Sequence, residues 1–74
     1  MNHPGIPWIG SSLRVRRQLA RMSQERLAKL LEVGETTVRR WEQDGNPPPA
    51  DAIPKLCKVF GCLPYDFARK PKII

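Results

Sequence analysis

The sequence predicts one small, compact all-α domain built from five short helices. Apolar residues recur at helical spacing, cap residues stand before these runs, and no segment is a candidate strand. A chain of 74 residues has room for one domain only. We divide it into an arm (1–10), a domain (11–69) and a tail (70–74).

The arm contains two prolines and two glycines, so we expect it to be extended, with Trp8 and Ile9 anchoring its end to the domain. Ser11 or Ser12 is the expected N-cap of the first helix, because a hydroxyl there can accept a bond from a free backbone N–H. That helix carries Leu13, Arg14, Arg16, Arg17, Leu19 and Ala20.

A second helix is predicted after Ser23, which is a good N-cap, and Glu25 suits the positive end of the helix dipole. Its core-facing stripe is Leu27, Ala28, Leu30 and Leu31. Residues 32–34 interrupt this helix, and a third helix is expected from Glu35 to Gln43.

The chain after the third helix begins with a proline-rich loop at residues 44–49, which cannot be helical. Asp51 is the expected cap of a fourth helix, with Pro54 in its first turn and Gly61 at its end. Leu56, Val59 and Phe60 are expected to face inward. Pro64 then opens a short fifth helix that contains Tyr65 and Phe67.

The charge balance favours a polyanionic partner. Thirteen Lys and Arg against seven Asp and Glu give a net charge of +6, which suits either nucleic acid or an acidic membrane surface. Cys57 and Cys62 match no zinc pattern and His3 is the single histidine, so we expect no metal and no cofactor. With no signal peptide and no apolar run long enough to span a membrane, we expect a cytoplasmic protein.

The second and third helices are joined by about three residues, so they must cross steeply. Ala28 is the small residue at the crossing and Val33 is the apolar residue of the turn, which is the geometry of a helix-turn-helix. Here the chain resembles the Cro/repressor-type helix-turn-helix domains of phage repressors and many bacterial regulators, over residues 11–68. The matching positions are Leu13, Arg14, Arg17, Ser23, Gln24, Glu25, Leu27, Ala28, Leu31, Val33, Thr37, Val38, Trp41, Glu42, Gly45, Leu56, Phe60 and Gly61.

The resemblance implies a lambda-repressor-like DNA-binding domain with its helix-turn-helix at helices two and three. It also implies that Arg17 and Glu42 pair between helices one and three. Arg21 and Glu32 stand where the family often has glycine, at positions that favour positive φ. Gly34 replaces the usual Ser or Thr cap of the third helix, and the loop after Glu42 is one residue longer than usual.

An angular count gives the third helix two unlike faces. At about 100° per residue, its polar residues gather on one side and Val38 and Trp41 fall on the other. The polar face can read base edges, since arginine can donate two bonds to guanine, threonine can contact thymine and glutamate can accept from cytosine. The expected base-contacting residues are Glu35, Thr36, Arg39 and Arg40.

Phosphate contacts are expected from the start of the second helix, where backbone N–H groups are free, and from polar side chains around it. The expected phosphate-contacting residues are Ser23, Gln24, Arg14, Arg21, Thr37 and Asn46.

These features predict a sequence-specific binder of double-stranded DNA that regulates transcription, as a repressor of bacterial or phage origin. A homodimer on a palindromic site is expected, with Leu63, Phe67 and the tail residues Ile73 and Ile74 at its interface. One alternative is an antitoxin that represses its own operon and uses residues 6–9 to dock a toxin. Another is an adapter whose third helix binds an acidic protein surface. No nucleophile–base pair, metal cluster or phosphate loop indicates an enzyme, and no helix pattern favours a membrane surface.

Overall fold

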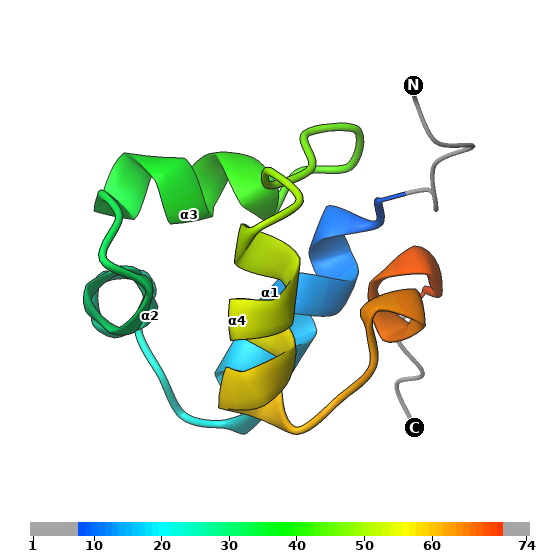
Figure 1. Cartoon of the computed structure of the whole chain (residues 1–74). Coiled ribbons are helices and arrows are strands. Elements are labelled where there is room, and N and C mark those ends of the chain that lie inside the picture. Colours follow the sequence, from blue (N-terminus) through cyan, green and yellow to red (C-terminus); the bar gives the residue numbers. More distant parts are fainter. Residues whose placement is uncertain (1–7, 71–74) are drawn as a thin grey trace.

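The computed structural model describes residues 8–70, and within that range the chain is all helical, without a strand. The elements are α1 (Gly10–Leu19), α2 (Gln24–Leu31), α3 (Glu35–Trp41), α4 (Ala52–Phe60) and the 3-10 helix η1 (Pro64–Ala68). Figure 1 shows α2 on one side of the molecule and η1 on the other, with α1 and α4 between them. The prediction of a small all-α domain is confirmed.

The fifth expected helix is only a 3-10 segment of five residues. Pro64 opens it, as predicted, and the Asp66 carboxylate accepts a hydrogen bond from the backbone N–H of Leu63 at 2.9 Å. Short 3-10 pieces of this kind commonly serve as connectors. The domain therefore has four α-helices, and α3 ends at Trp41, two residues earlier than expected.

The expected N-cap of α1 is wrong, because neither Ser11 nor Ser12 caps the helix. Helix α1 begins at Gly10, with Ile9 in the N-cap position and no side-chain cap bond. The Ser12 hydroxyl is buried and donates to the backbone carbonyl of Asp66 at 3.0 Å. Ser12 therefore ties α1 to η1.

Gly10 is required by the close approach of α1 to the end of α3. A Cβ atom on Gly10 would lie 2.5 Å from the backbone nitrogen of Gln43, well inside van der Waals contact. Any side chain at this position would push the two backbones apart. The absence of a side chain lets α1 begin directly against the segment that follows α3.

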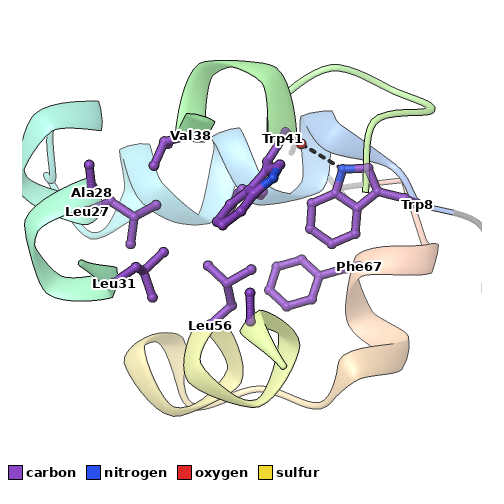
Figure 2. Close-up of a cluster of buried hydrophobic side chains, with 10 residues drawn as sticks. Trp8, Leu27, Ala28, Leu31, Val38, Trp41, Leu56 and Phe67 are labelled. Carbon is purple, nitrogen blue, oxygen red and sulfur yellow. Dashed lines mark hydrogen bonds between the residues drawn. The ribbon is translucent and has the colours of Figure 1, made fainter. Parts of the chain in front are cut away.

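One hydrophobic core joins all the elements (Figure 2). The most deeply buried side chains are Leu13, Leu27, Val38, Leu56 and Phe67. The expected burial of Leu30 is wrong, since 49% of this residue is exposed. At about 100° per residue, Leu30 lies on the flank of α2, outside the arc that Leu27, Ala28 and Leu31 turn toward the core. The expected inward position of Leu56 in α4 is confirmed, and Val59 and Phe60 pack against the core.

The expected positive φ angles at Arg21 and Glu32 are confirmed, at 56° and 60°. At each helix end the next residue donates back into the last turn: the Met22 N–H bonds the Arg17 carbonyl at 3.1 Å, and the Val33 N–H bonds the Ala28 carbonyl at 2.9 Å. This is the Schellman arrangement, which ends a helix through one left-handed residue.

Helix α4 ends in the same way at Gly61, as predicted, with φ at 63°. Asp51 stands at the N-cap position of α4 but makes no side-chain cap bond. None of the helices within residues 8–70 combines the length and the apolar character that a membrane crossing requires.

Candidate nucleic-acid interface

The turn between α2 and α3 fixes the angle at which the two helices meet. Ala28 of α2 is buried in the core, and Val33 of the turn packs half-buried against it. Gly34 then occupies the N-cap of α3 in an extended conformation and offers no side-chain cap. Figure 1 shows α2 and α3 crossing steeply, so the arrangement is that of a helix-turn-helix.

Helix α3 presents a polar face to solvent. Val38 and Trp41 are buried on its inner side. The four side chains expected to contact bases all lie on the exposed side: Glu35, Thr36, Arg39 and Arg40. The predicted outward orientation of this polar face is therefore confirmed.

Two of these four residues pair with each other. The Arg39 guanidinium lies 3.6 Å from the Glu35 carboxylate, one helical turn away, and about half of each side chain is exposed. A surface pair of this kind contributes about 0.2–1 kcal/mol, so opening it costs little. Within residues 8–70, Thr36 and Arg40 make no side-chain hydrogen bond or ion pair, which leaves both groups available to an external partner.

A buried polar network holds the inner side of α3 to α1. The Glu42 carboxylate is 4% exposed and accepts two bonds from the Arg17 guanidinium, from Nε and Nη2. The Arg17 Nη1 atom donates to the Met22 carbonyl at 2.8 Å, and Gln24 Nε2 donates to Glu42 at 3.0 Å. The network links the start of α2, the end of α1 and the end of α3. It therefore sets the position of the outward face of α3.

Some residues expected to contact phosphate already have partners within the domain. The Ser23 hydroxyl oxygen accepts from the Arg26 N–H at 2.9 Å and caps α2, as predicted. The Gln24 side-chain amide donates one hydrogen bond to Glu42, and the Asn46 amide donates one to Gln43 at 3.2 Å. Each of these amides keeps a second N–H.

The remaining expected phosphate-contacting residues are more open. Arg14 and Arg21 are exposed, and Thr37 is half-buried beside the N-terminus of α3. Arg21 lies in the turn between α1 and α2, so its left-handed backbone directs where the side chain leaves the domain.

Sequence reasoning missed the clamp at the C-terminus of α3. The Trp8 indole N–H donates to the Trp41 carbonyl at 2.6 Å, and the Trp8 carbonyl accepts from the Gly45 N–H at 3.4 Å. An anchoring role for Trp8 was expected, but its partners lie more than thirty residues away. No local pattern marks those partners.

The two cysteines are free and half-buried beside the core. Burial raises the pKa of the Cys62 thiol to about 11, and the neighbouring Cys57 adds to this rise. No group of three His, Cys, Asp or Glu side chains among the described residues is placed to hold a metal ion.

Comparison with known proteins gives one clear result. A family model described as a helix-turn-helix domain matches residues 8–69, which include every helix of the structure. No curated protein and no solved structure matches the chain significantly. The steep crossing of α2 and α3 at a short turn agrees with this match. The chain therefore belongs to the helix-turn-helix domain family.

Proposed function

We propose that this chain binds double-stranded DNA sequence-specifically through α3 and regulates transcription. One observation carries the proposal: four polar side chains of α3 face solvent while Val38 and Trp41 anchor the opposite side in the core. Membership of the helix-turn-helix family indicates DNA binding. We further propose that the chain is a domain of the Cro and lambda-repressor type.

In the proposed complex α3 lies in the major groove. Arg40 is the strongest candidate to read a base, because its guanidinium is exposed and unpaired within the described residues and can donate two parallel bonds to guanine. Thr36 contacts a neighbouring base edge. Glu35 and Arg39 separate from each other to accept from cytosine and to donate to a purine. The Glu35 carboxylate repels phosphate, which favours base reading over nonspecific adhesion.

The phosphate backbone is gripped next to α3 in this proposal. Ser23 and Gln24 stand at the start of α2, where backbone N–H groups are free, and Arg14 and Arg21 add positive charge. Thr37 and Asn46 supply neutral donors. Such contacts fix the register of the protein on DNA, while the base contacts of α3 give specificity.

A homodimer that represses transcription from a palindromic operator completes the proposal. One recognition helix spans too few base pairs for a unique address, and half-sites about 34 Å apart place two such helices on one side of the DNA. The expected dimer contact through Phe67 is wrong, because this residue is 1% exposed and belongs to the core. Leu63 is exposed and remains available for it, and Ile73 and Ile74 lie outside the described residues. A repressor of this kind acts in the cytoplasm of a bacterium.

The two alternative functions gain no support from the site. The antitoxin alternative needs residues 6–9 free to dock a toxin, but Trp8 is buried in the core, so that expectation is wrong for Trp8. Ile6 and Pro7 lie outside the described residues. The adapter alternative uses the same face of α3 that DNA binding uses. An adapter is expected to bind little DNA even at low salt, whereas the affinity of a DNA-binding protein is high at low salt and falls steeply as salt is added.

Selection of bound sequences from a random pool of duplex DNA tests the proposal. We expect a palindromic consensus, and an affinity for it that falls log-linearly with salt concentration. A consensus that is not palindromic would contradict the proposed homodimer. Recovery of no consensus, with negligible binding at low salt, would overturn sequence-specific DNA binding and favour the adapter.

A further inference from the structure

A second candidate binding surface lies between α1 and η1, away from the outward face of α3. The two elements enclose a groove of about 340 Å³. Its lining includes Val15, Arg16, Leu19, Asp66, Arg69 and Lys70. Figure 1 shows η1 on the side of the molecule opposite α2, so the η1 side of the groove lies away from the helix-turn-helix.

The groove carries a positive surplus. Three cations, Arg16, Arg69 and Lys70, stand against the single carboxylate of Asp66, for a net charge of +2. That carboxylate is already engaged, since it accepts from the Leu63 N–H and lies 3.8 Å from the Arg16 guanidinium. Asp66 therefore offsets Arg16, and the surplus of the groove lies on Arg69 and Lys70.

Two of the cations are held in place by aromatic rings. The Arg16 guanidinium carbon lies 5.9 Å from the centre of the Phe67 ring, and that of Arg69 lies 5.3 Å from the centre of the Tyr65 ring. A guanidinium that rests on a ring loses less freedom on binding and still presents its N–H edge. That edge matches the two oxygens of a carboxylate.

An apolar contact stands beside these cations. Leu19 is 78% exposed, the most exposed of the large apolar side chains in the described part of the chain, and Val15 is half-buried next to it. A phosphate backbone offers no apolar group for Leu19. A protein segment that carries both carboxylates and a bulky apolar side chain satisfies both halves of the groove.

We propose that the groove between α1 and η1 docks an acidic segment of a partner protein, with carboxylates on Arg16 and Arg69 and an apolar side chain on Leu19. Charge complementarity supports this occupant, because the groove has a surplus of two positive charges. The regulator then contacts a second protein while α3 remains on DNA.

Amide shifts of the full chain, labelled with ¹⁵N, test the proposal. The probe is a blocked six-residue peptide that alternates glutamate and leucine, and the control peptide replaces each leucine with serine. We expect saturable shifts at Val15, Leu19 and Arg69 with the first peptide, and about tenfold weaker binding of the second. Leu19→Ser and Arg69→Glu are each expected to weaken the first peptide about tenfold, while Lys58→Glu on α4 leaves its affinity within about twofold.

Four results would overturn the proposal. The first is equal binding of both peptides, with Lys58→Glu as harmful as Arg69→Glu, because this indicates nonspecific charge attraction. The second is shifts in the groove with duplex DNA but with neither peptide. The third is self-association that Leu19→Ser abolishes, which assigns the groove to a second copy. The fourth is contact of residues 71–74 with Leu19 in the free chain, with no peptide binding.

Discussion

The indole N–H of Trp8 donates a hydrogen bond to the carbonyl oxygen of Trp41, with 2.6 Å between the two atoms (Figure 2). Trp41 is the last residue of α3, so its carbonyl has no partner inside the helix. The Trp8 ring also packs on Phe67, with 5.3 Å between ring centres. The segment that precedes α1 therefore holds the C-terminal end of the proposed recognition helix against the core.

Trp8→Phe keeps an aromatic ring in the core but removes the indole N–H. We expect the free energy of unfolding to fall by about 1–3 kcal/mol, because the buried Trp41 carbonyl loses its donor. Urea denaturation followed by far-ultraviolet circular dichroism measures the change. Tyr65→Phe, on the exposed side of η1, is the control and should change stability by less than about 0.5 kcal/mol. Equal stability of Trp8→Phe and the parent chain would show that this bond contributes nothing.

Glu42→Ala breaks the buried network between α1 and α3. We expect a loss of about 3–5 kcal/mol in unfolding free energy, because Arg17 is then left nearly buried without its counter-ion. The matched control is Glu25→Ala, which breaks the exposed pair with Lys29 and should cost less than about 0.5 kcal/mol. Similar losses in both variants would contradict a special role for the buried pair.

Glu32→Gly relieves the left-handed backbone at the end of α2. Glu32 has φ at 60°, a conformation that costs a residue with a side chain about 1–2 kcal/mol. After the greater entropy of glycine in the unfolded chain is subtracted, we expect a gain of about 0.5–1 kcal/mol and a higher midpoint of thermal unfolding. Lys29→Gly, inside α2, should instead lower stability by about 1 kcal/mol. A loss of stability in Glu32→Gly would contradict this account of the turn.

The Cys62 thiol should react slowly with iodoacetamide at pH 8, because the thiolate is the nucleophile and burial raises the thiol's pKa from 9.0 to about 11. Mass spectrometry of the alkylated peptide at increasing pH should show a rate that keeps rising toward pH 11. The same chain in urea should level off near the ordinary value. Since the folded chain holds this proton more tightly, the stability it contributes is present below about pH 9 and lost as pH rises toward 11. A plateau near pH 9 in the folded chain would contradict the shift.

Features of the fold that depend on neighbouring residues were predictable from the sequence. Ser23 caps α2 and Gly61 ends α4 because each outcome is decided within one helical turn. The positive φ angles of Arg21 and Glu32 were expected from the family resemblance, which places glycine at these positions. The prediction that Ser11 or Ser12 caps α1 was wrong because the start of this helix depends on distant residues. Ser12 bonds a residue 54 positions away, and Gly10 packs on the segment after α3, so tertiary contacts move the start of α1.

In the candidate site, too, the sequence predicts the features that depend on local periodicity and misses those that depend on tertiary contacts. The outward face of α3 follows from helical periodicity alone, which needs no knowledge of the rest of the chain. The engagement of Gln24 with Glu42 and the clamp of Trp8 on Trp41 depend on how the helices meet, and no local pattern shows them. Burial of Phe67 and exposure of Leu30 likewise depend on which neighbours the packed helices provide.

The most direct test of the central claim is the affinity of Arg40→Ala for a selected duplex and for a scrambled one, at the same salt concentration. The control is Lys58→Ala, in the last turn of α4 and at the end of that helix away from α3 (Figure 1). If α3 reads bases, Arg40→Ala loses about 1–3 kcal/mol on the selected duplex, relaxes specificity at one position and changes little on the scrambled one. An equal loss on both duplexes, or no loss on either, would contradict base reading by Arg40.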